Sequence, residues 1–478
     1  MKPKPEHPAW IYVVFPAVAM LLGWGLRGYI GGGPFGALIP GCFVALSLSL
    51  LLGYRMETAA MAALFGAVGI GYGGDMTYGQ TLGFLNDSDT VLWGLLGCLV
   101  KGGIWGLLGS AVLGTGLTRD RYDVKTLTVA FVLTVVAFYV GVKLINDPKL
   151  IYFSNRLDKP RDESWAGLLF AAITFLGYLR YRGSAEAFAL PFRFALWGML
   201  GGALGFGGGA LWMVFGPHLP VPQQWIGWWK AMEFSFGLIL GAALGYCAYL
   251  NRERLYVAGQ QGEAPPAAWG PVGVFFVFVA AVFIAYPVVG SLLPEGIAES
   301  RTLSVLLVRD VFRVLFGFVF FGGLCIILGL RSLHAAWQIA VTLTVFHCVL
   351  DYVRDLDDPE RFGYALPVSV QLLILLVATG AVGHLTIRFQ HSPQPIRRIY
   401  LLVLWACYAV ACVRSFFLKD FFFPPEGESL LSVITQHHAS LFFVHGTFTV
   451  SAIITTWFIL RLGNSSDEAV TANSQYRQ

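Results

Sequence analysis

Charged side chains are scarce in this chain of 478 residues, in which Asp, Glu, Lys and Arg make up 13% of the sequence. Soluble globular domains carry about 25% charged residues. Hydrophobic residues account for 56% of the chain, and its mean hydropathy is +0.66. This composition excludes an ordinary soluble domain and indicates that most of the chain lies within a membrane.

The sequence also lacks the short motifs that mark many enzymes and nucleic-acid-binding proteins. It contains no nucleophile motif, no Walker loop, no zinc signature and no nucleic-acid-binding module. All seven cysteines fall within apolar segments, where they are typical of small core residues rather than of a disulfide framework. We therefore expect no cofactor, no bound metal and no nucleic-acid partner.

Long apolar runs, in contrast, recur from residue 11 to residue 462. Each is long enough to cross a hydrocarbon core of about 30 Å. We predict an all-α, polytopic integral membrane bundle of about 14 transmembrane helices. The expected spans are 11–28, 35–53, 57–74, 91–117, 126–146, 165–180, 190–215, 225–250, 270–293, 303–330, 334–353, 366–389, 398–418 and 440–462.

Lysine and arginine are distributed unevenly over the loops between these spans. With the N-terminus in the cytoplasm, most basic residues lie inside, and the outer loops 75–90 and 216–224 hold none. This asymmetry predicts that both termini are cytoplasmic and that the number of spans is even. Loop 147–164 carries both signs of charge and is the largest candidate for an ordered outer loop. A compact chain without sorting signals suits a bacterial inner (plasma) membrane.

Two apolar segments carry a glycine ladder, meaning small residues at every fourth position of a predicted helix. One ladder is Gly102, Gly106, Ser110 and Gly114, and the other is Gly237, Gly241 and Gly245. Such a stripe lets another backbone approach closely, which is how helices pack in lipid. Lys101 precedes the first ladder, and Lys230 and Glu233 precede the second. We therefore expect a tightly packed bundle with polar groups in its interior.

The ladders belong to two stretches that resemble each other, 57–117 and 193–250. Each stretch has a glycine-rich helix end, a loop and then a ladder. An offset of four spans makes this a candidate parallel internal repeat of the kind found in transporters; chance likeness of glycine-rich helices is the alternative.

We divide the chain into a glycine-rich bundle (1–250), a linker (251–269), a second bundle (270–462) and a polar C-terminal tail (463–478).

Arg27 ends the first predicted span and is followed by a run of glycines, Gly31, Gly32 and Gly33. Glycines adopt positive φ readily, so their amides can form an anion-binding nest. Pro34 then suits the first turn of a helix, whose N-terminus adds a partial positive charge. The segment predicts a carboxylate or phosphate site. The alternative is a tight hairpin whose arginine reaches toward lipid headgroups.

Asp75, Tyr78 and Gln80 lie in a polar, glycine-punctuated segment between two apolar spans. Irregular backbone at membrane depth needs protein or a water-filled cavity to satisfy its polar groups. The segment therefore predicts a broken or re-entrant stretch whose side chains line a pathway. The alternative is a plain outer loop over residues 75–90 that caps the next helix.

Lys101 lies about ten residues into a predicted span, near the middle of the membrane. We expect it to face a carboxylate, with Asp75, Glu233 and Asp310 as candidates. Lys230 and Glu233 are three residues apart, so they share a helix face and are candidates to pair with each other. Buried pairs of this kind serve either function or structure.

Arg309, Asp310 and Arg313 enter a span in the second half of the chain. The two arginines share a helix face, where they either clamp an anion or brace Asp310 and a neighbouring helix; we favour bracing. His347 and Asp351 are also four residues apart, but one such pair is too few ligands for a metal site.

Three functions agree with these features. The first is a secondary transporter of a small anionic solute, coupled to protons through the intramembrane Lys, Asp and Glu residues. The second is a membrane-embedded enzyme acting on a lipid or lipid-linked sugar through Asp75, loop 147–164, Arg309 and Arg313. The third is a non-catalytic membrane scaffold. We favour the transporter, whose partners are membrane lipids and the anion.

Overall fold

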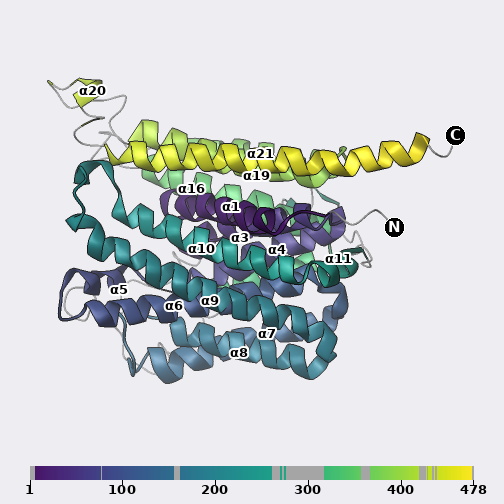
Figure 1. Ribbon diagram of the computed structural model, residues 1–478, viewed down its shortest axis with the longest axis horizontal. Helices are drawn as coiled ribbons and strands as arrows, with labels where there is room; N and C mark the ends of the chain where they lie inside the picture. Colours follow the sequence, from purple (N-terminus) through teal and green to yellow (C-terminus); the bar gives the residue numbers. More distant parts are fainter. Residues whose placement is uncertain are drawn as a thin grey trace.

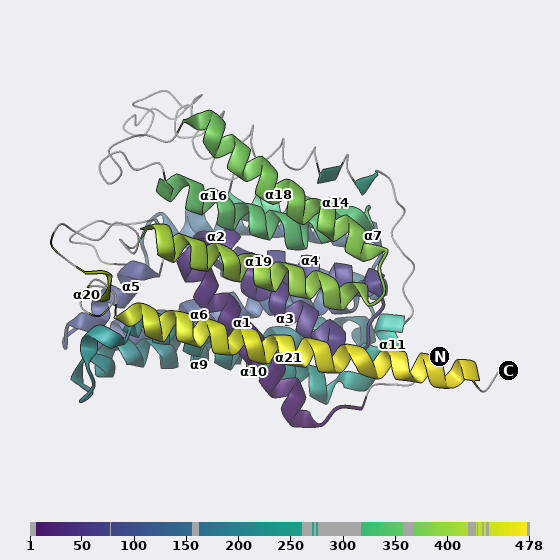
Figure 2. The same cartoon turned by 90° about the horizontal axis from the view of Figure 1, so that it is seen from above.

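The computed structural model describes residues 6–76, 78–154, 162–260, 270–271, 274–275, 317–356, 367–418, 427, 429–432, 435 and 439–475. All regular structure in these ranges is helical, and they contain no strand. The long helices run side by side along one common direction (Figure 1). The start of α1 and the end of α21 lie at the same end of this bundle (Figures 1 and 2).

The first half of the chain forms eleven helices, and the second half adds seven in its described part. The first set is α1 (Ala9–Ile30), α2 (Gly33–Gly36), α3 (Leu38–Leu51), α4 (Met56–Gly73), α5 (Gly79–Gly83), α6 (Val91–Leu117), α7 (Val124–Gly141), α8 (Trp165–Arg182), α9 (Ala185–Phe215), α10 (Trp228–Leu250) and α11 (Arg252–Gln260). The second is α14 (Phe318–Gly329), α15 (Leu333–Trp337), α16 (Thr344–Leu356), α18 (Val368–Gln390), α19 (Pro395–Leu418), α20 (Leu430–Ser432) and α21 (Ser440–Gln475). Two π-helical turns, Val142–Asn146 and Gln338–Leu343, extend α7 and join α15 to α16.

Ten helical segments within the described ranges are long and apolar enough to cross a membrane. They are α1, α2–α3, α6, α7, α9, α10, α15–α16, α18, α19 and α21. The expected spans 57–74 and 165–180 form helices α4 and α8, which are less apolar; α8 has two arginines in its last turn. The expected spans 270–293 and 303–330 lie mostly outside the described residues. The chain is therefore a multi-pass helical membrane protein by length and composition, with ten candidate spans in the described part.

Six helices of the first half form a closed ring. In order around it, α1 contacts α3, α3 contacts α4, α4 contacts α6, α6 contacts α9, α9 contacts α10, and α10 returns to α1. The ring consists of three helical hairpins, α1–α3, α4–α6 and α9–α10. The close packing of this ring depends on residues that have no side chain.

The ladder of α6 lies against α9. A Cβ atom added at Gly106 would lie 1.8 Å from the carbonyl oxygen of Gly198, and one added at Gly102 would lie 2.3 Å from that of Gly202. The ladder of α10 lies against α1 in the same way. A Cβ atom added at Gly245 would lie 1.9 Å from the carbonyl oxygen of Tyr12. Both predicted ladders are thus helix-packing faces, as expected for lipid-embedded helices.

In the hairpin α1–α3, helix α3 packs against α4 in the same way. A Cβ atom added at Gly41 of α3 would lie 2.2 Å from the carbonyl oxygen of Gly66 in α4. At three places in the ring, therefore, the second helix of one hairpin presents a glycine to the first helix of the next. No larger residue is compatible with these approaches unless the helices separate.

Aromatic side chains fill the interior of the ring. Trp24 of α1 contacts Trp105 of α6, with ring centroids 5.0 Å apart, and Phe236 of α10 at 4.1 Å. Phe206 of α9 stacks on Phe236 at 5.3 Å. Helices α1 and α6 lie opposite each other in the ring, so the contact between the two tryptophans crosses its interior.

The remaining helices pack around the ring. Helix α8 contacts α6 and α9, and α7 contacts α8 and α14. In the second half, α14 contacts α4, whereas α19 and α21 contact α1. The beginning of the expected linker is helix α11, from which the Leu255 carbonyl accepts a hydrogen bond from Tyr54 at 3.2 Å. The division into two bundles stays a prediction; the expected tail begins within α21, which continues as a helix to Gln475.

Candidate functional site

Arg27 is the centre of a polar cluster at the end of the ring opposite the termini. It lies in the last turn of α1 and is 2% exposed. Its guanidinium carbon lies 5.0 Å from the ring centroid of Tyr78, 5.1 Å from that of Trp105 and 5.9 Å from that of Trp24. A cation above several aromatic faces is held by their negative quadrupoles. The side chain therefore rests on the aromatic interior of the ring and does not extend toward headgroups.

The hydrogen bonds of Arg27 leave its buried Nε–H without a partner in the described structure. One terminal nitrogen donates to the Tyr78 hydroxyl, and the other donates to the Gly33 carbonyl at 3.4 Å. Its Nε atom is buried and has no hydrogen-bond partner among the described residues. A buried N–H without an acceptor is costly, so an acceptor that enters the cluster gains this bond.

The glycine turn adopts the predicted backbone, but it serves a different purpose. Gly32 and Gly33 have φ values of +52° and +49°, in the region that favours glycine. The amides of Gly31 and Gly32 both donate to the Arg27 carbonyl, the latter at 2.7 Å. These two amides are therefore occupied, and the expected anion-binding nest is not formed by them. The turn instead closes α1 directly after Arg27 and holds this side chain in place.

Glu233 provides the negative charge of the cluster. Its carboxylate lies over Gly28, where an added Cβ atom would be 2.2 Å from both carboxylate oxygens. It accepts hydrogen bonds from Lys230 Nζ at 2.6 Å and from Trp229 Nε1 at 3.1 Å. The Tyr78 hydroxyl, which accepts from Arg27, donates to the same carboxylate at 3.4 Å. Tyr78 thus links Arg27 to Glu233.

The cluster carries more positive than negative charge. Among the side chains that the structure describes in direct contact here, Arg27 and Lys230 face one carboxylate, that of Glu233, which is 1% exposed, while the Lys230 side chain is 13% exposed. Arg414, whose guanidinium carbon lies 5.6 Å from the ring centroid of Tyr29, has its own partner in Asp355. An excess of buried positive charge is costly unless an anion offsets it. The arrangement is therefore suited to receive one more negative group.

Lys101 does not join this cluster. Its Nζ atom lies 2.7 Å from Oε1 of Glu163, and both side chains are 1% exposed. Glu163 also accepts hydrogen bonds from the Phe153 amide and the Ser154 hydroxyl. Lys101 donates in addition to Thr81 Oγ1 at 2.8 Å. The pair is enclosed and satisfied, so it fastens loop 147–164 to α6.

Lys101 faces a carboxylate, as expected, but this carboxylate is Glu163 of the outer loop, which was not among the candidates. Of the three candidates, Glu233 pairs with Lys230 as expected, and Asp310 lies outside the described residues, as do Arg309 and Arg313. Glu163 was missed because hydropathy marks loop 147–164 only as polar. The one available signal was its mixed charge, which had indicated an ordered loop.

The segment with Asp75, Tyr78 and Gln80 lies beside the middle of α6. Helix α4 ends at Gly73, where an added Cβ atom would lie 2.0 Å from Trp105, well inside α6. The connection from Gly74 to residue 90 therefore covers the N-terminal half of α6, and its short helix α5 contacts that half. This depth favours the re-entrant interpretation. Asp75 and Gln80 are half-buried there, and the Asp75 carbonyl accepts from Ser164 Oγ at 2.7 Å.

The second half of the chain contributes polar side chains that the sequence did not connect to Arg27. His347 Nε2 lies 2.6 Å from the Gly31 carbonyl oxygen, and its ring stacks on Phe35. Tyr29 is hydrogen-bonded to Ser415, which in turn bonds to His445 Nε2. No group of three or more potential metal ligands occurs in the described ranges.

Comparison with known proteins adds no further assignment. The chain matches no protein-family model, no curated protein and no solved structure. Its function is therefore inferred from the geometry of the cluster around Arg27.

Proposed function

We propose that this chain is a secondary transporter of a small anion, and that Arg27, Tyr78, Lys230 and Glu233 form its binding site. The observation that carries this proposal is the buried cluster of two cations around one carboxylate. The cluster lies where α1 and α4 end inside the ring. Helix breaks with buried charges are the usual place of solute sites in transporters.

Glu233 acts in this proposal as an internal anion that the solute replaces. Its carboxylate occupies the donors of Lys230 and Tyr78. Protonation of Glu233 removes its negative charge and weakens both interactions. A solute carboxylate or phosphate then accepts from Lys230 Nζ and from the unpaired Nε of Arg27. One proton thus enters with each negative charge, which couples anion movement to the proton gradient.

We further propose that the ring is built from three parallel repeats. Two of them are the predicted stretches 57–117 and 193–250, which contain the hairpins α4–α6 and α9–α10, and the third is the hairpin α1–α3. Trp105 directly precedes Gly106, and Phe236 directly precedes Gly237, and both aromatic rings point into the ring interior. Hairpin α1–α3 uses Gly41 in the same relation to its neighbour. Rocking of such repeats around a shared site is a common mechanism of alternating access.

For the membrane placement we propose cytoplasmic termini, a bacterial inner membrane and about 14 spans. The basic residues of the loops support this orientation, as does the position of the start of α1 and the end of α21 at one end of the bundle (Figures 1 and 2). The Arg27 cluster then lies in the outer half of the bundle.

A second candidate is the non-catalytic scaffold. It is favoured by a specific observation, namely that Lys101, Arg414 and Lys230 each have a carboxylate partner. Pairs of this kind are compatible with a purely structural role. The enzyme alternative has less support, because Glu163 of loop 147–164 is enclosed in its pair with Lys101.

A ligand screen on the purified protein tests the proposal. Thermal unfolding is measured in detergent with carboxylates, inorganic phosphate, sulfate, neutral sugars and lipid-linked sugars, for the wild type, Arg27→Gln and Lys230→Gln. Lys143→Gln is the matched control. Lys143, like Lys230, pairs with a carboxylate one helical turn away, that of Asp147, but it lies away from the cluster. We expect an anion to stabilise the wild type and the control but neither cluster variant.

Three other results would each redirect the interpretation. Stabilisation only by lipid-linked sugars would favour the enzyme. Equal stabilisation of all variants by an anion would place the site elsewhere. If no compound stabilises the wild type and the cluster variants merely unfold earlier, the scaffold is the better description.

A further inference from the structure

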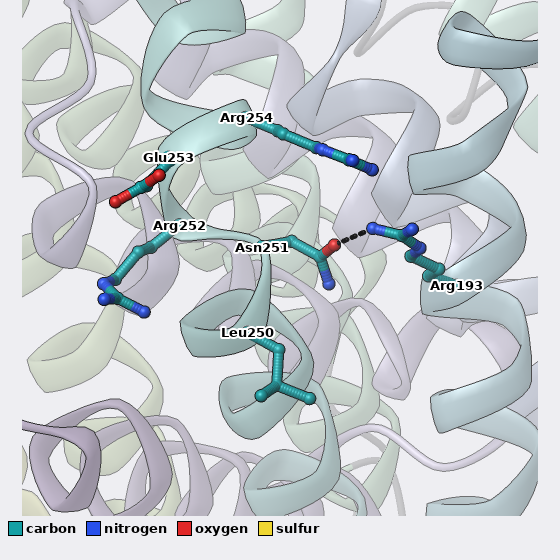
Figure 3. A pocket seen from close by; sticks show the side chains of 6 residues that line it. All are labelled: Arg193, Leu250, Asn251, Arg252, Glu253 and Arg254. Atoms are coloured by element: carbon teal, nitrogen blue, oxygen red, sulfur yellow. Dashed lines mark hydrogen bonds between the residues drawn. The ribbon is translucent and has the colours of Figure 1, made fainter.

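A second polar site lies at the opposite end of the bundle from Arg27. Helix α10 begins near Glu233 and ends at Leu250, about 25 Å away at 1.5 Å per residue. A cavity of about 320 Å³ lies at this end, beside the start of α11. Arg193, Leu250, Asn251, Arg252, Glu253 and Arg254 line it (Figure 3). The start of α1 and the end of α21 lie at this same end of the molecule (Figures 1 and 2).

A buried asparagine organises this cavity. Asn251 is 5% exposed, and its amide nitrogen donates to the Cys247 carbonyl at 2.8 Å. Its Oδ1 atom accepts from Arg193, so the guanidinium of α9 is held at a defined position (Figure 3). The asparagine thereby joins α9 to the connection between α10 and α11.

Two arginines converge in this cavity. Arg254 extends from α11 toward Arg193, whereas Arg252 points the other way, over the ring of Tyr249 (Figure 3). Within the described ranges neither Arg193 nor Arg254 pairs with a carboxylate. The carboxylate of Glu253, which also lines the cavity, is directed away from these two arginines (Figure 3). Two guanidinium groups that face each other in this way form a geometry suited to a phosphate, which accepts planar, bidentate hydrogen bonds.

An apolar surface adjoins the cavity. Leu250, which lines it, is 51% exposed, and Tyr246 lies one turn away on α10 with 38% exposed. On α9, Leu196 and Leu200 follow Arg193 at helical spacing and are also exposed. In a membrane-spanning bundle this surface faces acyl chains. A ligand that fits both parts has a phosphate at one end and a hydrocarbon chain at the other.

We propose that this cavity binds the headgroup phosphate of an anionic phospholipid. Arg193 and Arg254 hold the phosphate, and the exposed face around Leu250 and Leu196 contacts its acyl chains. Basic pockets between membrane helices bind anionic lipids in this way. Because the lipid bridges α9, α10 and α11, its binding stabilises the hairpin that carries Glu233. The site is separate from the Arg27 cluster and does not depend on its function.

Native mass spectrometry of the detergent-purified chain tests this proposal. The probes are phosphatidylglycerol, phosphatidylcholine of the same chains, and inorganic phosphate. The variant is Arg193→Gln/Arg254→Gln. The matched control, Arg180→Gln/Arg182→Gln, removes two exposed arginines at the same end of the bundle and so changes the net charge equally.

We expect phosphatidylglycerol to bind the wild type and the control, with at least about tenfold weaker binding to the variant, since each charge-assisted hydrogen bond contributes roughly that factor. Undiminished binding to the variant would overturn the site. Equal binding of phosphatidylcholine would overturn its anionic preference. Displacement of the lipid by inorganic phosphate at equal concentration would assign the cavity to a free anion instead.

A single substitution covers the case in which the double variant does not fold. Arg254 is exposed and has no hydrogen-bond partner in the described structure, so Arg254→Gln leaves the packing of α9 and α10 unchanged. The proposal requires this variant to lose affinity for phosphatidylglycerol as well. Wild-type affinity in Arg254→Gln would contradict it.

Discussion

Helices α6 and α10 both carry a glycine ladder, and in both a lysine precedes the ladder in the sequence. Their backbones approach a neighbouring helix equally closely, as Gly106 and Gly245 show. Their lysines differ. Lys101 is enclosed with Glu163 in a satisfied pair, whereas Lys230 shares Glu233 with the hydroxyl that binds Arg27. The same packing pattern therefore supports a balanced, closed charge pair in one hairpin and an unbalanced cluster in another.

This difference separates a charge pair that serves packing from the cluster that we propose to bind an anion. A pair whose atoms are all bonded to each other and to the backbone has no capacity for a ligand. A cluster with one excess cation and one unbonded donor has that capacity. The identity of the residues, a lysine and a glutamate in each case, does not distinguish the two.

The largest loss of stability is expected from substitutions in the glycine ladders, which α6 and α10 share. Gly106→Ala places a Cβ atom 1.8 Å from the Gly198 carbonyl oxygen, and Gly245→Ala places one 1.9 Å from that of Tyr12. Each should destabilise the fold by about 3 kcal/mol or more, since backbone atoms must move. Gly103→Ala is the control on α6, because its nearest atom, Ala203 Cβ, is 3.5 Å away. Thermal unfolding in detergent measures all three, and a wild-type melting temperature for Gly106→Ala would contradict the packing.

The second largest effect concerns the enclosed pair. Glu163→Gln leaves Lys101 buried without a carboxylate, which should cost about 3–5 kcal/mol. Adding Lys101→Met removes the unpaired charge, so the double variant should recover most of this loss. Unfolding of the two variants in denaturant checks the prediction. A double variant that is no more stable than Glu163→Gln alone would contradict the interpretation of Lys101 and Glu163 as an enclosed, mutually neutralising pair.

The corresponding change in α10 is expected to be milder. Lys230 is 13% exposed and also donates to the Gly25 carbonyl at 3.4 Å, so after Glu233→Gln it keeps one acceptor and more contact with solvent than Lys101 has. We expect a loss of about 1–2 kcal/mol, close to that of one charge-assisted hydrogen bond. The same denaturant experiment measures it. A loss as large as that of Glu163→Gln would show that both pairs are structural.

The smallest loss of stability is expected for the cap of α7, a helix outside the ring, which serves as a reference. Asp123 caps α7 by accepting from the Thr126 amide at 2.5 Å, and this bond lowers the pKa of its carboxyl from the usual 3.8. Asp123→Ala should cost about 1 kcal/mol at neutral pH. Because the folded-state pKa is lowered, the contribution is complete above about pH 3.8 and disappears as pH falls below it. Melting temperatures of both proteins should therefore converge at low pH; a constant difference would contradict the cap.

The sequence predicted the helical membrane class and the position of the ten candidate spans in the described part. It singled out Arg27, Tyr78, Lys230 and Glu233 but did not group them into one cluster. These features depend on local patterns, namely apolar length, helical spacing and glycines beside charges. Lys230 and Glu233 were placed together because they are three residues apart. The positive φ of Gly32 and Gly33 followed from their lack of a side chain.

Long-range contacts escaped prediction because no local pattern encodes them. Glu163 lies 62 residues from Lys101 and meets it only after loop 147–164 folds back over α6. The third hairpin of the ring was also missed, because α3 presents only one close glycine, Gly41, where α6 and α10 present several. Likewise, nothing near Tyr29 in the sequence points to Ser415 or His445.

The central claim is that Glu233 competes with a bound anion for the donors of Lys230 and Arg27. It is tested most directly by measuring the affinity of the stabilising anion for the wild type, Glu233→Gln and the control Lys143→Gln under the same conditions. The account predicts tighter binding by Glu233→Gln than by the wild type and the control, because the competing carboxylate is removed. Equal affinity in all three proteins would contradict it.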